Sequence, residues 1–173
     1  MFIWDNRAMS DQTTAAPPAA LDGAASARSA HGEAWGALTR THAAVSQRLQ
    51  DALAAADFPP LPWYEVLATV AEAPEQRMKM GDLAEALVIT RGGLTKLVDR
   101  LIKAGLMERT FCETDRRVSY ATLLPAGAEM LAEMRPVVVA ELKSSFAVSL
   151  SAAQARDLRD ALDRVRDSAC DAH

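Results

Sequence analysis

A short stretch near the middle of the sequence carries basic and hydroxylated side chains at a spacing that suits contact with DNA. Five apolar residues recur at three- and four-residue intervals and predict the buried stripe of a helix: Leu94, Leu97, Val98, Leu101 and Ile102. The opposite face of that helix carries Arg91, Gly92, Thr95, Lys96, Asp99 and Lys103. Such a helix can enter a major groove, where its N-terminal residues reach base edges and its dipole favours phosphate. An ordinary solvated helix has the same pattern, so the neighbouring segments must decide between the two.

The charge around this helix is basic, although the chain as a whole is acidic. The 173 residues carry 19 Lys or Arg and 23 Asp or Glu, a net charge of −4. Residues 77–117 hold nine Lys or Arg and six Asp or Glu, so this window is +3 and the rest of the chain is −7. The asymmetry fits a basic DNA-reading surface on an acidic body.

The surrounding segments predict a helix-turn-helix followed by a hairpin. Apolar periodicity predicts three helices ahead of the basic one, over residues 33–56, 63–73 and 81–87. Val88 and Ile89 form a tight turn, Thr90 caps the basic helix, and Gly105 follows its end. Two β-prone segments then predict a hairpin, over residues 106–112 and 118–123.

Two more helices and a tail complete the expected organisation. One helix runs from Pro125 to about residue 147 and is expected to kink at Pro136. The capping box Ser151–Gln154 opens the last helix. Residues 1–31, rich in Ala, Ser, Pro and Thr, are predicted to be a flexible tail, within which Met9 is a second candidate start.

The ordered motifs resemble the MarR family of bacterial transcriptional regulators. The resemblance rests on the segments 80–90, 91–100, 101–109, 115–117 and 125–127. It extends in layout over roughly residues 33–169 and is most specific from 80 to 127. It implies a mainly α-helical fold with a small β-hairpin wing, that is, a winged helix-turn-helix with N- and C-terminal dimerisation helices.

The resemblance also implies which residues contact double-stranded DNA. Five residues of the basic helix would face the major groove: Thr90, Arg91, Gly92, Thr95 and Lys96. Arg116 at the hairpin tip would enter the minor groove, whose negative potential attracts arginine where the groove is narrow. Arg117 would bind phosphate or position the wing, or it would pair with Asp115 or Glu113.

Two departures from the family pattern affect the expected site. Gly92 and Gly93 replace bulkier polar residues, and each glycine costs about 1 kcal/mol relative to alanine in a helix. Base contacts would then be fewer, and the operator sequence cannot be read from the helix. Leu124 replaces a threonine before the helix that starts at Pro125, which removes an N-cap.

The resemblance divides the chain into three regions and suggests an effector pocket. Residues 1–31 form the tail, 32–60 together with 125–173 form the dimerisation region, and 61–124 form the DNA-binding lobe. Four residues are candidates for a pocket that accepts a phenolic or lipophilic effector: Trp35, His42, Trp63 and Tyr64. The alternative is that these side chains are core and interface aromatics.

The expected function is a homodimeric transcriptional repressor that binds a pseudo-palindromic operator and is released by a small effector. Without GxSxG, P-loop, GxGxxG or HExxH motifs, the chain is not expected to be an enzyme. Two distant cysteines and three histidines predict neither a metal site nor a disulfide framework, and no cofactor is expected. A cytoplasmic location at the nucleoid, without a membrane partner, follows. The alternative function is a winged-helix interaction module that no longer binds DNA.

Overall fold

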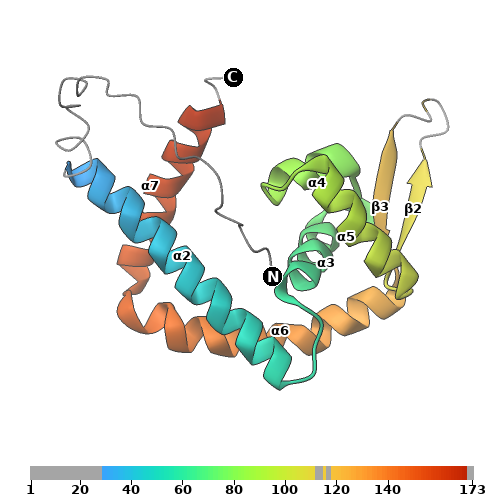
Figure 1. Ribbon diagram of the computed structural model, residues 1–173, viewed down its shortest axis with the longest axis horizontal. Coiled ribbons are helices and arrows are strands. Elements are labelled where there is room, and N and C mark those ends of the chain that lie inside the picture. The colour runs from blue at the N-terminus through green and yellow to red at the C-terminus, as the bar shows by residue number, and fades with distance from the viewer. Residues whose placement is uncertain (1–28, 112–114, 116–117, 171–173) are drawn as a thin grey trace, which may run out of the picture. The chain divides into compact units, whose positions relative to one another are not determined.

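The computed structural model describes residues 29–111, 115 and 118–170. Within these ranges the chain is mostly helical and carries one small sheet (Figure 1). The helices are α2 (Ala30–Ala55), α3 (Leu61–Glu72), α4 (Met80–Ala86), α5 (Arg91–Lys103), α6 (Pro125–Ser145) and α7 (Ala152–Cys170), with short 3₁₀ turns η1 (Pro74–Gln76) and η2 (Ala147–Ser149). The strands are β1 (Arg77–Lys79), β2 (Met107–Phe111) and β3 (Ser119–Leu123). The chain divides into two units, residues 1–40 and 41–173.

The predicted hairpin is present, and a third strand joins it. Strands β2 and β3 pair antiparallel, from Met107 opposite Leu123 to Phe111 opposite Ser119. Strand β1 pairs antiparallel with the other edge of β3, which gives the strand order β1-β3-β2. Strand β1 was not predicted from the sequence because three residues are too few to show an alternating pattern. Pairing with β3 makes these residues a strand.

The basic helix buries the stripe that its periodicity predicted. Leu94, Val98 and Leu101 are fully buried, and Leu97 and Ile102 are partly buried against the same core. That core also takes in side chains of α3, α4, both hairpin strands and α6, among them Val66, Leu83, Met107, Ala121 and Leu131. Full burial of one such leucine contributes about 1.5–3 kcal/mol, so α5 is held firmly by its apolar side. Its polar side is left for other contacts.

A second apolar cluster joins the end of α2 to α3 and α6. Leu53 and Met134 are fully buried there, and Leu49, Leu61 and Val138 are nearly so. On the surface nearby, Arg48 donates to Glu141 at 2.5 Å. That hydrogen bond keeps the pKa of Glu141 below its ordinary value. Two residues that are 93 positions apart in the chain therefore tie α2 to α6.

Two prolines, Pro62 and Pro136, lie inside helices. Helix α3 begins at Leu61, not at residue 63, and includes Pro62 in its first turn. A proline is tolerated there because the first N–H groups of a helix have no intrahelical partner. Helix α6 runs as one element from Pro125 to Ser145 with Pro136 inside it.

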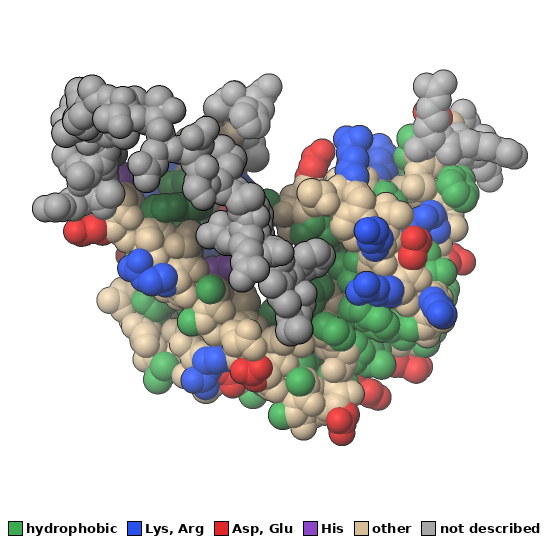
Figure 2. Space-filling view, viewed as in Figure 1, with side chains coloured by type: hydrophobic (Ala, Val, Ile, Leu, Met, Phe, Trp, Pro, Cys, Tyr) green, Lys and Arg blue, Asp and Glu red, His purple; other side chains and the backbone are tan. Residues whose placement is uncertain are grey.

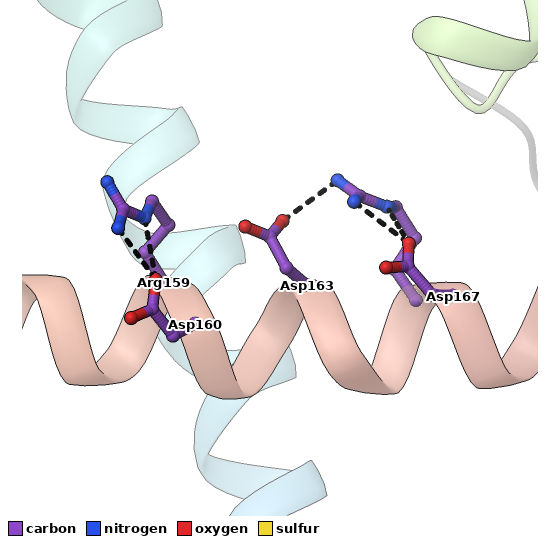
Figure 3. A network of polar contacts seen from close by, with 5 residues as sticks. Arg159, Asp160, Asp163 and Asp167 are labelled. Atoms are coloured by element: carbon purple, nitrogen blue, oxygen red, sulfur yellow. Dashed lines mark hydrogen bonds and ion pairs between the residues drawn. The ribbon is translucent and has the colours of Figure 1, made fainter.

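The last helix begins where its capping box predicted. The backbone N–H of Ser151 donates to Gln154 Oε1 at 2.9 Å, and the N–H of Gln154 donates to Ser151 Oγ at 3.3 Å. Figure 3 shows ion pairs along the exposed face of α7, where Arg159 pairs with Asp160 at 2.7 Å. Arg166 similarly bridges Asp163 and Asp167, at 2.9 Å to each. Exposed pairs of this kind contribute little to stability because water and salt screen them.

Candidate DNA-binding surface

Thr90 caps the helix that carries most of the predicted site. Its Oγ1 accepts a hydrogen bond from the backbone N–H of Gly93 at 3.1 Å, and its own backbone is extended. The cap leaves the first turn of α5 open to the solvent. All five residues predicted to face the major groove are exposed: Thr90, Arg91, Gly92, Thr95 and Lys96. They lie on the side of α5 opposite the buried stripe, so the structure brings them together on one face.

The two glycines of this turn have different surroundings. A Cβ built at Gly92 would meet no atom within 4 Å, whereas a Cβ at Gly93 would lie 3.1 Å from Thr90 Oγ1. Packing within the chain therefore does not demand glycine at 92, and at 93 only the capping hydroxyl stands close. The Thr95 hydroxyl donates to the carbonyl of Arg91 at 2.9 Å, so its proton is already engaged within the helix.

The turn ahead of α5 holds a strained residue. Val88 has φ +53°, in the left-handed region that β-branched residues avoid, and it is 90% exposed. The N–H of Val88 donates to the carbonyl of Glu85 at 3.1 Å, and that of Ile89 donates to the carbonyl of Ala84 at 3.0 Å. The predicted tight turn is therefore confirmed, and valine occupies its least favourable position.

An ion pair fastens α5 to the hairpin. Nη2 of Arg109, on β2, donates to Oδ1 of Asp99, on α5, at 2.9 Å. Asp99 is therefore engaged with the wing strand although it lies on the polar face of α5. This pair could not be predicted from the sequence, because the contact depends on how β2 packs on the helix. On the other edge of the sheet, the guanidinium of Arg77 lies 4.2 Å from the ring centroid of Tyr120.

The tip of the hairpin lies largely outside the described residues. Arg116 and Arg117, predicted to contact DNA, both fall there, as does Cys112. Asp115 is exposed, and its carbonyl accepts the N–H of Val118 at 2.9 Å, which starts the return into β3. The assignment of Arg116 to the minor groove remains a prediction.

Lys and Arg side chains gather on the face that carries α4 and α5. Figure 2 shows them over these two helices and the lower part of the hairpin. This one lobe carries four of these cations: Lys79 on β1, and Arg91, Lys96 and Lys103 on α5. A concentration of cations on a single face is what a phosphate backbone attracts.

The four residues proposed for an effector pocket have different environments. Trp63 and Tyr64, both on α3, are half-buried against the core, and Tyr64 also contacts the second cluster. His42 is exposed, and Trp35 is 66% exposed. Glu65, which the sequence analysis did not single out, follows Tyr64 directly. More than a third of it stays exposed, yet burial raises the pKa of its carboxyl, and the charge of His42 opposes that shift.

Neither a metal site nor a membrane-spanning single helix is found within residues 29–111, 115 and 118–170. Among those residues no group of three or more His, Cys, Asp or Glu is placed to hold a metal ion. No single helix there has both the length and the apolar character needed to cross a membrane. Residues Pro125–Ser149 and Ala152–Ala169 meet those limits only as a pair, bent by 96°.

The fold and this surface define a winged helix-turn-helix protein. The MarR family model matches residues 56–118. The chain has the fold of AbsC from Streptomyces coelicolor, a MarR family transcriptional regulator, with 27% identity over 78% of this chain and 90% of that one and a TM-score of 0.71. Sco3205 from the same organism, solved in complex with DNA, gives 27% identity over 79% and 86% of the two chains and a TM-score of 0.72.

A third similar structure is CouR from Rhodococcus jostii bound to p-coumaroyl-CoA. It shares the fold at 21% identity, covering 80% of this chain and 94% of that one, with a TM-score of 0.69. No curated protein sequence matches the chain significantly. The resemblance to the MarR family is therefore confirmed by the match of the family model to the lobe and by the shared fold.

Proposed function

We propose that this chain is a dimeric, sequence-specific DNA-binding regulator that acts as a transcriptional repressor. The observation that carries the proposal is the two-sided character of α5. Its apolar stripe is fully buried at Leu94, Val98 and Leu101, while the polar and basic residues of its first turns are all exposed. Sco3205, which has the same fold, was solved with DNA. Such a helix can place side chains on base edges without disturbing its own core.

The first turns of α5 combine positively charged side chains with a glycine that has no side chain. Arg91 and Lys96 attract phosphate, and the capped N-terminus adds the positive end of the helix dipole. Gly92 leaves open space beside them, which lets a DNA backbone approach closely. Arg116 of the wing would read the adjacent minor groove, with Arg117 on phosphate.

The dimer is inferred from α7, whose apolar side chains are not buried by the rest of the chain. None of the side chains from Ala152 to Ala169 of α7 is buried, and Leu158, Leu162 and Val165 form an exposed apolar stripe. A helix of this length draws its stability mainly from packing of its apolar face. A second copy of the chain would cover the stripe, and the two α5 helices would then address half-sites about one helical turn apart.

A small effector would act by shifting the dimer to a spacing that does not fit the operator. His42, Trp63 and Tyr64 stay proposed lining residues of the effector pocket, and CouR, which shares this fold, was solved with p-coumaroyl-CoA. An anionic effector near His42 would also meet Glu65. A neutral phenolic ligand therefore fits better than a bare anion. A repressor of this kind works on the nucleoid, in the cytoplasm.

The test is fluorescence anisotropy of the purified protein on DNA from upstream of its own gene, with random DNA as competitor, at several salt concentrations. Tight binding that resists the competitor and weakens steeply with salt supports the proposal. If neither this DNA nor fragments selected genome-wide bind above the random control at low salt, the proposal is wrong. The alternative interaction module would then be favoured.

A further inference from the structure

A groove separates the sheet edge from the helix-turn-helix. Its volume is about 350 Å³. It is lined by residues of β1, α4, α5 and the start of β3: Lys79, Met80, Gly81, Asp82, Arg91, Thr95, Val118 and Ser119. Two of these, Arg91 and Thr95, belong to the proposed DNA-reading face. The groove is thus next to that face and continuous with it.

The charges around the groove are two cations and one carboxylate. Lys79 and Arg91 are exposed, and within the part of the chain that the structure describes neither forms an ion pair. Asp82 is exposed on the same rim, which leaves a net charge of about +1. Ser119 adds a hydroxyl, whereas the hydroxyl of Thr95 already donates to Arg91. A net single positive charge suits a monoanion better than a dianion.

We propose that this groove binds one backbone phosphodiester of DNA, held between Lys79 and Arg91, and that Asp82 limits its affinity. The inference rests on the proposed function, and it adds a DNA contact at Lys79 that the proposed function does not include. A phosphodiester carries one negative charge, which matches the groove. Sulfate carries two negative charges at neutral pH, and inorganic phosphate is a mixture of the monoanion and the dianion. The second charge of either dianion would lie close to Asp82.

The two cations lie on different elements, so a phosphate bound by both would link these elements. Arg91 opens α5, and Lys79 lies opposite Tyr120 on β3, a strand of the wing. One phosphate held by both would connect the recognition helix to the wing sheet. Contacts to phosphate set the register of a protein on the duplex without reading sequence. Lys79 is therefore inferred to be a positioning residue.

The test uses Lys79→Gln and Asp82→Asn in the full-length protein, with anisotropy measured at several salt concentrations. Lys79→Gln is expected to weaken operator and random DNA by the same factor, about 5–10-fold, and to reduce the salt slope by about one. Asp82→Asn is expected to tighten both without reducing the slope. The control for loss of one charge is Lys143→Gln, an exposed lysine near the end of α6 and outside the DNA-binding lobe. Size-exclusion chromatography first shows that this variant keeps the wild-type oligomeric state, and it should then change neither affinity nor slope. Thermal melting of each variant confirms that it is folded.

A second measurement locates the phosphate. A single methylphosphonate, which removes one backbone charge, is scanned through the operator. At one position the methylphosphonate should weaken operator binding by the wild type by about the same factor as the Lys79→Gln substitution does. At that position it should not weaken binding by the Lys79→Gln variant further, because both changes remove the same contact.

Several outcomes would overturn the inference while leaving the proposed function intact. The first is that Lys79→Gln binds the operator with the same affinity and the same salt slope as the wild type. Loss of operator binding alone, with random DNA unaffected, would show that Lys79 reads bases. If inorganic phosphate protects the wild type against thermal unfolding, and Lys79→Gln abolishes that protection without weakening DNA, the groove is a site for free anions. Absence of any salt-dependent DNA binding by the wild type would instead reject the proposed function, and this inference with it.

Discussion

Arg109 on β2 donates to Asp99 on α5 at 2.9 Å, so the wing is fastened to the helix that precedes it. The pair is partly exposed, and Arg109 Nε is buried without a hydrogen-bond partner among the described atoms. One carboxylate therefore meets only part of the guanidinium's bonding capacity. The relationship sets the position of the wing from within the lobe.

A double-mutant cycle should measure the coupling of this pair. Asp99→Asn and Arg109→Gln are each expected to lower the free energy of unfolding, and the double variant should lose less than their sum. The coupling should be about 0.5–1 kcal/mol because solvent screens a partly exposed pair. Urea denaturation of the four proteins gives the value. Simple additivity would mean that the pair does not hold the wing.

Gly127 permits a close approach between α6 and the start of the hairpin. A Cβ at this position would lie 2.2 Å from the carbonyl oxygen of Leu106 and 2.8 Å from Leu123 Cδ1. Since the backbone must move to accept it, Gly127→Ala should destabilise the protein by about 1–3 kcal/mol. Gly81→Ala, in α4 with no atom within 4 Å, is the control and should be neutral or slightly stabilising. Equal effects of the two substitutions in thermal unfolding would contradict this packing.

Val88 should be replaceable with a gain in stability. Its φ of +53° is strained for valine, and its 90% exposure means that little packing is lost. Val88→Gly and Val88→Asn should each raise the free energy of unfolding by about 0.5–1 kcal/mol, since both residues accept left-handed backbone. Val88→Ala retains the strain and serves as the control. A destabilised glycine variant would show that valine at this turn makes a contact worth more than the strain.

The carboxyl of Glu65 should give stability a specific dependence on pH. Burial raises the pKa of Glu65 above its ordinary 4.5, so the folded chain holds this proton more tightly than the unfolded chain. Well below pH 4.5 both states are protonated and the residue has no effect on the pH dependence. As pH rises from 4.5 through the folded pKa, the stability of the wild type should fall relative to Glu65→Gln.

Urea denaturation at pH 4 to 7 checks this expectation. Glu129→Gln, an exposed glutamate on α6, is the matched control. A stability difference between Glu65→Gln and the wild type that stays constant over this range would show that burial does not perturb the carboxyl.

Arg116 tests the wing assignment directly. Arg116→Ala should weaken operator binding and relax the sequence preference next to the wing, because a guanidinium in a narrow minor groove responds to local groove width. Lys143→Gln is again the control. Anisotropy with operators altered only at the flanking positions measures both effects. Unchanged affinity and unchanged preference would remove Arg116 from the interface.

Features that depend on neighbours along the chain could be predicted from the amino-acid sequence. The buried stripe of α5, the cap at Thr90 and the box at Ser151–Gln154 follow from spacings of three or four residues, because a helical turn brings such residues together. The ordered motifs likewise indicated the winged helix-turn-helix. The polar residues predicted for the major groove are exposed, because the opposite stripe is buried. Their contact with DNA stays a prediction.

Tertiary structure alone decided the contacts between segments that are distant in the sequence. Strand β1 exists through its pairing with β3, some 43 positions further on, and a three-residue segment has no pattern of its own. The Asp99–Arg109 pair and the groove between Lys79 and Arg91 depend on how the sheet packs against α5. Gly127 matters because the carbonyl of Leu106 comes so near it. Side-chain periodicity records which face of an element is buried, whereas the partner that covers the face is chosen by packing of the whole lobe.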